Sequence, residues 1–173
     1  PSEKVVNSFG VQDDFMYQYA LPILNERAGT GNPFFSVLLS ISNHPPYVIP
    51  PYFHPHSDVL EEQIVEYADW SIRQFMQAAE KQPWFDNTIF VFLGDHGKMV
   101  GTPECEMPQS YNHIPLMIYG KDIKPGVYDG FGGQVDVSPT LLGLLNISYL
   151  QNNFGVNLLE EERPCMFFSA DNM

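Results

Sequence analysis

An aspartate and a histidine stand side by side at residues 95 and 96, between Gly94 and Gly97. They directly follow the apolar run 89–93, which is typical of a buried strand. Where a backbone leaves a strand, neighbouring carboxylate and imidazole groups can turn toward one divalent ion, and flanking glycines allow a tight bend. The pattern therefore predicts Asp95 and His96 as metal ligands. The alternative is a polar turn in which Asp95 caps a helix and His96 is solvated.

A second polar cluster, Ser42-Asn43-His44, follows the apolar run 34–41 in the same way. An imidazole at this place could donate a hydrogen bond to a phosphate oxygen or move a proton to a leaving group. The alternative is a loop histidine packed among the prolines and tyrosine of residues 45–47. Because the carboxyl ends of parallel strands share one edge of a sheet, the sequence predicts His44 at the same edge as Asp95 and His96.

The remaining histidines and a cysteine have weaker contexts. His113 precedes the apolar run 114–119, so it is expected at the entering end of a strand or in a loop over the site, with a structural role as the alternative. His54 and His56 form a His-Pro-His sequence in a proline-rich stretch, and exposed loop histidines of this kind usually bind no metal. Cys105 is expected to be a loop thiol, since no base stands beside it. No Walker, G-x-G-x-x-G, G-x-S-x-G or H-E-x-x-H pattern occurs.

Strands and helices are expected to alternate along the chain. The patterns predict strands over 34–41, 89–93, 114–119 and 166–168, and helices over 13–27, 58–81 and from 136. Asp13-Asp14 and Asp58 are expected at N-caps, and Pro22 predicts a kink or an early stop. Ser138 and Pro139 are expected as the cap and the first residue of the last helix. This alternation indicates an α/β fold with a partial doubly wound, mostly parallel sheet and helices on both faces.

The bulk composition excludes some partners. The chain has 173 residues, of which 44% are hydrophobic, and this indicates one domain or one piece of a larger one. Eight Lys and Arg residues against 21 Asp and Glu residues give a formal charge of −13, which argues against a nucleic-acid partner. No apolar run reaches the ~18 to 20 residues that span a bilayer. Cys105 and Cys165 alone do not make a disulfide framework.

Five segments, taken in order, resemble the second half of the sulfatase-type domain of lipoteichoic acid synthases and related phosphoglycerol transferases. These enzymes belong to the alkaline phosphatase and sulfatase superfamily, and the ordered set carries the resemblance rather than any one segment. The segments are Pro33-Phe34-Phe35 through Ser42-Asn43-His44-Pro45-Pro46-Tyr47, Glu66-Tyr67-Ala68-Asp69, Asn87-Thr88-Ile89 through Gly94-Asp95-His96-Gly97, His113-Ile114-Pro115-Leu116, and Gln134-Val135-Asp136-Val137-Ser138-Pro139-Thr140-Leu141-Leu142. The resemblance covers about residues 13 to 168.

The resemblance implies a site and a cofactor. Asp95 and His96 would hold one divalent ion, Mn²⁺ first, with Ca²⁺, Zn²⁺ or Mg²⁺ as alternatives. Asn43 and His44 would contact the transferred phosphate, and His113 the substrate. The nucleophile of the family, a Thr in the synthases or a modified Cys or Ser within C/S-x-P-x-R in the sulfatases, belongs to the first half of the domain, and neither is visible here. Residues 1–173 are therefore expected to be the C-terminal portion, with half a metal site and no catalysis alone.

The intact parent protein is then expected to be a phosphoglycerol transferase that works through a covalent phospho-enzyme. Its substrate would be a small or lipid-linked molecule of the envelope that bears a phosphate or sulfate ester. By the same resemblance it would work at the extracytoplasmic face of a bacterial membrane, behind N-terminal membrane helices. The alternatives are a sulfatase, a phosphoethanolamine transferase and a non-catalytic metal- or anion-binding remnant of the fold. A sheet edge left open by absent strands would favour self-association.

Overall fold

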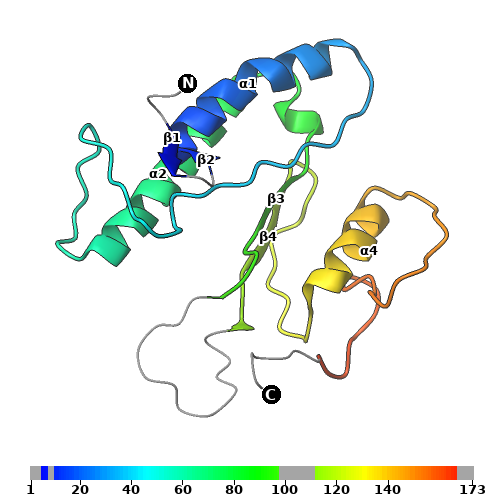
Figure 1. Cartoon of the computed structure of the whole chain (residues 1–173). Coiled ribbons are helices and arrows are strands. Elements are labelled where there is room, and N and C mark those ends of the chain that lie inside the picture. The colour runs from blue at the N-terminus through cyan, green and yellow to red at the C-terminus, as the bar shows by residue number, and fades with distance from the viewer. Residues whose placement is uncertain (1–4, 8–9, 98–111, 167–173) are drawn as a thin grey trace. The chain divides into compact units, whose positions relative to one another are not determined.

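The computed structural model describes residues 5–7, 10–97 and 112–166 (Figure 1). The chain divides into two compact units, Pro1–Ile89 and Phe90–Met173, which are called the first and the second unit. The predicted loop over 98–112 lies almost entirely outside the described residues, and Cys105 lies there with it. Among the described helices, none has the length and apolar character needed to cross a membrane.

Two helices dominate the first unit. Helix α1 (Asp13–Gly29) and helix α2 (Leu60–Ala79) pack along each other (Figure 1). Tyr17 of α1 stacks on Phe75 of α2, with ring centroids 5.0 Å apart. The buried face of α2 repeats every three or four residues, through Ile64, Tyr67, Ser71, Phe75 and Ala79. Both helices predicted for this part of the chain are confirmed.

The ends of these helices differ from the sequence prediction. Helix α1 continues through Pro22, which is exposed, so the carbonyl group that lacks a helical donor there can be hydrated. Helix α2 begins after the N-cap Val59, and Asp58 is therefore not its cap. Short elements flank the helices: the antiparallel strands β1 (Val5–Asn7) and β2 (Gly10–Val11) precede α1, and the 3-10 helix η2 (Phe85–Asn87) follows α2.

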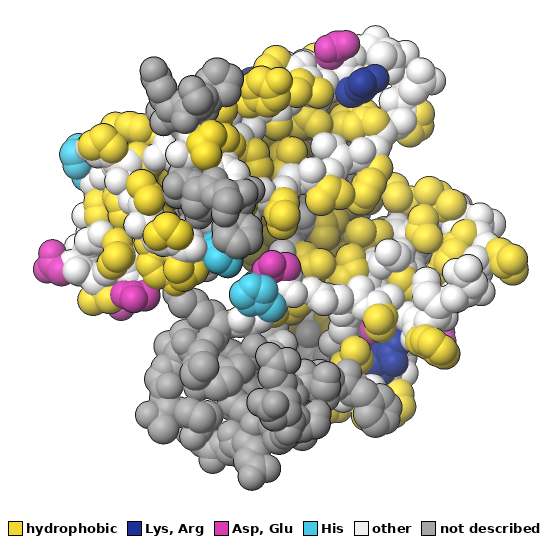
Figure 2. All heavy atoms as spheres, in the orientation of Figure 1, with side chains coloured by type: hydrophobic (Ala, Val, Ile, Leu, Met, Phe, Trp, Pro, Cys, Tyr) yellow, Lys and Arg dark blue, Asp and Glu magenta, His cyan; other side chains and the backbone are white. Residues whose placement is uncertain are grey.

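The predicted buried strand over residues 34–41 is wrong for this structure. The segment forms no strand pairing with any described residue, and most of its apolar side chains are exposed. Phe35 is 86% exposed and Leu39 is 70% exposed. Hydrophobic side chains also cover much of the surface that Figure 2 shows. An apolar run shows that residues are suited to burial, but it does not supply the neighbouring strand that would cover them.

We expect this exposed segment to make the chain self-associate as its concentration rises, because extended β-prone backbone is a template for pairing with another chain. Replacing Phe35 and Leu39 together with lysine should return the chain to monomer, as measured by sedimentation velocity. Leu150 and Phe154, which are 93% and 94% exposed, provide the matched lysine control outside the segment. A chain that is already monomeric at every concentration would contradict the prediction.

The second unit holds a strand pair and one helix. Strands β3 (Phe90–Leu93) and β4 (Leu116–Tyr119) are antiparallel, and Phe90 pairs with Tyr119 while Leu93 pairs with Leu116. Both strands fall within their predicted runs, which confirms them. The sequence predicts a mostly parallel sheet, whereas both described strand pairs are antiparallel. Here β4 is the next described strand after β3, and the two pair directly with each other in antiparallel register.

Helix α4 (Gln134–Leu144) follows in the second unit and begins earlier than predicted. Its N-cap is Gly133, so Ser138 is not the cap and Pro139 lies inside the helix rather than at its first position. The cause is Asp136, whose carboxylate accepts the N–H of Gly133 at 2.8 Å and closes the first turn. Of the last predicted strand, Met166 is not in a strand, and residues 167–168 lie outside the described residues.

Candidate functional site

Asp95 and His96 lie where the chain leaves β3, in the tight turn of residues 94–97, called the Asp95–His96 turn. Both side chains are largely exposed, at 75% and 73%. The Oδ2 atom of Asp95 lies 3.8 Å from the Nε2 atom of His96, which is too long for a hydrogen bond. The other oxygen, Oδ1, accepts the backbone N–H of His96 at 3.0 Å. One carboxylate oxygen therefore fixes the turn, and the other faces the imidazole.

The tautomer of His96 follows from the contact of its ring with the backbone carbonyl group of Gly97. The Nδ1 atom lies 2.7 Å from the carbonyl oxygen of Gly97, and a carbonyl can only accept, so Nδ1 carries the proton and donates. In the neutral ring Nε2 then holds the lone pair, and this is the nitrogen that faces Asp95. A metal-binding histidine is commonly arranged in this way, with its second nitrogen donating to a backbone carbonyl.

Two further contacts hold the Asp95–His96 turn in place. The side-chain amide of Gln134, the first residue of α4, donates to the carbonyl oxygen of Asp95 at 2.7 Å and to that of Gly94 at 3.3 Å. A Cβ atom at Gly94 would lie 3.2 Å from the Cβ of Ile114, so a larger residue would crowd the neighbouring segment. The sequence predicts no role for Gln134, since nothing in its local pattern shows that α4 begins beside this turn.

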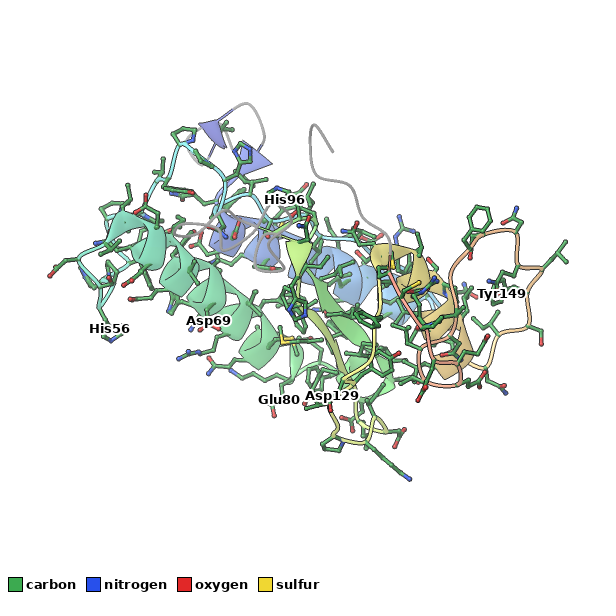
Figure 3. All side chains as sticks on the ribbon, turned by 90° about the horizontal axis from the view of Figure 1, so that it is seen from below. His56, Asp69, Glu80, His96, Asp129 and Tyr149 are labelled. Carbon is green, nitrogen blue, oxygen red and sulfur yellow. The ribbon has the colours of Figure 1, made fainter. Side chains whose placement is uncertain are left out.

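His113 lies at the same end of the β3–β4 pair as this turn. Leu93 pairs with Leu116, so the residues just before β4 stand at the end where β3 gives way to Asp95 and His96. His113 is exposed there. Figure 3 shows His96 at this end of the strand pair. His113 therefore precedes β4 at this end of the antiparallel pair, and its contact with substrate stays a prediction.

Asn43 and His44 belong to the first unit. They lie in residues 42–52, called the histidine loop, and both are exposed. The backbone N–H of His44 donates to the carbonyl oxygen of Ile41 at 3.0 Å. Its Nδ1 lies 2.7 Å from the carbonyl oxygen of Pro45, so Nδ1 carries the proton, and Nε2 is the basic nitrogen of the neutral ring. An imidazole in this state can take up a proton at Nε2 and later release it.

Asp13 and Asp14 are buried at the start of α1, although the sequence predicts them as N-caps. The N-cap is Gln12, which makes no side-chain cap hydrogen bond. Asp13 Oδ1 instead accepts the backbone N–H groups of Ile41 and Ser42, each at 3.0 Å. The prediction fails because a local pattern places an acidic residue at a helix start but cannot show a partner 28 residues away.

Asp14 binds two tyrosine hydroxyl groups. Its Oδ2 accepts from Tyr52 of the histidine loop at 2.7 Å, and its Oδ1 accepts from the buried Tyr67 of α2 at 2.6 Å. Burial, followed by the hydrogen bond and charge of Asp14, raises the pKa of Tyr52 to about 12. The same causes raise the pKa of Tyr67 well above its usual value. Both phenols therefore stay protonated near neutral pH and remain donors to the carboxylate.

The chain matches the family model described as Sulfatase over residues 2–147. It belongs to the sulfatase family. Among curated proteins it is 25% identical to lipoteichoic acid synthase 2 of Bacillus subtilis, over 98% of this chain and 29% of that protein. It is 23% identical to the lipoteichoic acid synthase of Staphylococcus aureus, over 92% of this chain and 28% of that protein. This sulfatase-family chain thus spans under a third of the length of these relatives.

Solved structures agree with the family and show the fold. A protein of the alkaline phosphatase superfamily from Vibrio parahaemolyticus matches with a TM-score of 0.79 and 30% identity, over 93% of this chain and 39% of that chain. The lipoteichoic acid synthase LtaP of Listeria monocytogenes matches with a TM-score of 0.75 and 27% identity, over 89% of this chain and 44% of that chain. The sulfatase-family chain therefore has the α/β, alkaline-phosphatase-like fold that the sequence predicts.

The Asp95–His96 turn of this sulfatase-family chain fits part of a metal site. Two ligand atoms that each lie about 2 Å from a shared ion stand roughly 3 to 4 Å apart, and Asp95 Oδ2 and His96 Nε2 meet this condition. Oxygen and imidazole donors suit Mn²⁺, Zn²⁺ or Mg²⁺. The described residues contain no group of three His, Cys, Asp or Glu side chains that could complete such a site. The pair is therefore an incomplete ligand set.

His56 of the first unit pairs with a carboxylate of the same unit. Its Nδ1 lies 3.2 Å from Oε2 of Glu66, which also accepts the backbone N–H of His56 at 2.7 Å. Glu66 Oε1 accepts the N–H of Ser57 at 3.0 Å. These hydrogen bonds, led by that from the His56 backbone, lower the pKa of Glu66. His56 precedes α2 and contacts Glu66 within it, so the pair fixes the approach of the chain to that helix (Figure 3).

Proposed function

We propose that this sulfatase-family chain is the C-terminal part of a metal-dependent phosphoglycerol transferase that acts on a lipid or glycan of the bacterial envelope. The arrangement of Asp95 and His96 carries the proposal, because their facing ligand atoms and the fixed tautomer of His96 suit one divalent ion. The similarity to lipoteichoic acid synthases supports phosphoglycerol transfer as the reaction. By the same similarity, the longer protein would work at the extracytoplasmic face of the membrane, held there by membrane helices outside this chain.

Asp95 and His96 would hold the ion, for which Mn²⁺ is the first candidate. When bound, such an ion supplies positive charge for phosphoryl oxygens and lowers the pKa of a coordinated hydroxyl group. Gln134 would keep the turn in shape through its hydrogen bonds to the backbone carbonyls. The remaining ligands and the nucleophilic hydroxyl group would come from the part of the longer protein outside this chain.

His44 would act on the group being transferred. In its protonated form, Nε2–H donates to a phosphate oxygen or passes its proton to the leaving alkoxide, which becomes an alcohol as the ring becomes neutral. In the second half-reaction the neutral Nε2 accepts the proton of the incoming alcohol, which restores the imidazolium. The amide group of Asn43 would donate to the same phosphate. A phospho-enzyme formed on the nucleophilic hydroxyl would link the two half-reactions.

The function experiment uses the longer protein with a fluorescent phosphatidylglycerol in vesicles and measures release of diacylglycerol. We expect Mn²⁺-dependent release, and we expect Asp95→Asn with His96→Gln to lower the rate by more than the ~10- to 100-fold that loss of an outer ligand partner costs. The matched control is His56→Gln with Glu66→Gln, which removes a histidine–carboxylate pair of the first unit that consists of the exposed His56 and the partly buried Glu66. The Asp95 and His96 substitutions should also abolish Mn²⁺ binding by the 173-residue chain, followed by electron paramagnetic resonance.

A sulfuric ester hydrolase is the second candidate, favoured by the description of the matching family model. Release of sulfate from an aryl sulfate, with no diacylglycerol from the lipid, would replace the first proposal with this one. Mn²⁺ binding at Asp95 and His96 with neither activity would indicate a metal-binding remnant of the fold. Full activity in the Asp95 and His96 variant would contradict the metal-dependent mechanism.

A further inference from the structure

Two neighbouring acidic residues fasten both ends of the histidine loop to the same helix turn. Asp13 binds the beginning of the loop, because its carboxylate accepts the N–H of Ser42 at 3.0 Å. The contact is reciprocal, since the N–H of Asp13 donates to Oγ of Ser42 at 3.3 Å. Asp14 binds the far end, because its carboxylate accepts the hydroxyl of Tyr52 at 2.7 Å. The loop is therefore held at its first and last residues.

The burial of these contacts makes the attachment firm. Asp13 is 2% exposed and Ser42 is 4% exposed. A carboxylate in such a place must keep its hydrogen bonds, because leaving it unpaired away from water is costly. Its partners are backbone N–H groups, which no side-chain rotation can withdraw. Asp14 is likewise buried and receives the fully buried Tyr67 of α2, so its own position is fixed from a second helix.

The residues that Asp13 binds lie close to His44 in the chain. His44 is two residues from Ser42, and its own N–H donates to the carbonyl oxygen of Ile41 at 3.0 Å. Ile41 is the second residue whose N–H Asp13 accepts. A shift of the backbone at residues 41–42 therefore moves the imidazole directly. Catalytic groups lose much of their effect when displaced by about 1 Å, which can cost roughly 100-fold in rate.

We propose that Asp13 and Asp14 are positioning residues that hold the histidine loop so that Asn43 and His44 meet the transferred phosphate. This inference rests on the proposed function of His44, but its geometry lies wholly within the first unit. Neither acidic residue touches substrate. Their role is to set the place of a loop that carries no regular secondary structure of its own.

The test combines hydrogen exchange with turnover in the longer protein. Asp13→Ala removes the acceptor, whereas Asp13→Asn keeps an oxygen at the same place. We expect Asp13→Ala to speed amide exchange at residues 41–44 by at least about tenfold and to lower kcat about 10- to 100-fold with a smaller change in KM. Asp13→Asn should restore both values to near those of the unaltered protein. Mn²⁺ binding should be the same in all variants.

A second pair of variants keeps the test decisive if Asp13→Ala does not fold. Tyr52→Phe and Tyr67→Phe each remove one hydroxyl donor from Asp14, but only Tyr52 belongs to the histidine loop. Tyr52 is 46% exposed, so its hydroxyl can be removed with little disturbance of the core. We expect Tyr52→Phe to loosen residues 48–52 and lower kcat, and Tyr67→Phe, which only weakens the support of Asp14, to speed the exchange of the loop less than Tyr52→Phe does.

The outcomes separate this inference from the proposed function. Unchanged loop exchange in both Asp13→Ala and Tyr52→Phe would overturn the positioning role. A loosened loop with normal turnover would also overturn it, provided that His44→Ala is inactive in the same assay. If His44→Ala is itself fully active, the proposed function fails, and the positioning role falls with it.

Discussion

Replacing His44 with alanine in the longer protein is expected to lower kcat by about 100- to 10,000-fold, the range that a general acid–base group contributes. The physical reason is the state of the ring. Nδ1 donates to the carbonyl oxygen of Pro45 at 2.7 Å, so the proton transfer proposed for His44 would take place at Nε2. Alanine leaves neither a donor for the phosphate oxygen nor a base for the incoming alcohol.

Mn²⁺ binding should be unchanged in this variant, because the proposed ligands are Asp95 and His96. Rates would be measured as diacylglycerol release at saturating lipid, and Mn²⁺ binding by electron paramagnetic resonance. His54→Ala is the matched control, since His54 is another exposed histidine of the same proline-rich stretch. A normal rate for His44→Ala, or an equal loss in both variants, would remove the catalytic role of His44.

The sequence predicts the helices well because their signal is local. The three- to four-residue repeat of Ile64, Tyr67, Ser71 and Phe75 is visible without any knowledge of the partner helix. The Asp95–His96 turn is predicted for a similar reason, since an apolar run ends directly before it. In both cases the residues that decide the structure are close together in the sequence.

The contacts that fix the site were not predictable, because they join residues far apart in the chain. Gln134 reaches the carbonyl oxygen of Asp95 across 39 residues, and Asp13 reaches Ser42 across 29. A short polar motif does not identify such a partner. The run 34–41 shows the reverse case, in which a strong local signal for a strand is not sufficient, since no described strand pairs with it.

Asp136 makes a third set of long-range contacts. Its replacement is expected to be the most destabilising single change in the second unit. The side chain is fully buried, and its carboxylate accepts the N–H of Gly133 and the N–H of Val156, each at 2.8 Å. Arg163 adds a bidentate ion pair through Nε and Nη2. The same guanidinium donates to the carbonyl oxygen of Phe154 at 2.8 Å. The carboxylate of Asp136 therefore connects the first turn of α4 to residues 156–163, which follow this helix in the chain.

We expect Asp136→Ala to lower the free energy of unfolding of this unit by about 3 kcal/mol, because it leaves a guanidinium and two backbone donors without their acceptor. Amide exchange at Gly133 and Val156 should then rise about 100-fold, since 1.4 kcal/mol corresponds to roughly a factor of ten. Hydrogen exchange is the suitable measurement, because both tryptophans, Trp70 and Trp84, belong to the first unit. Asp129→Ala, an exposed acidic residue of the second unit, should leave these amides unchanged.

The pH dependence of the stability that Asp136→Ala loses distinguishes loss of the ion pair from loss of side-chain packing. Burial alone would raise the pKa of Asp136, but the hydrogen bonds from Arg163, Val156 and Gly133 outweigh it and lower the pKa below its usual value. The stabilisation is therefore complete above the unfolded pKa of about 3.9 and is lost as the pH falls through the lower folded value. The difference between the unaltered protein and Asp136→Ala should narrow in acid below about pH 4. A difference that stays constant with pH would show that the charge of Asp136 does not contribute, and that only the volume of its side chain does.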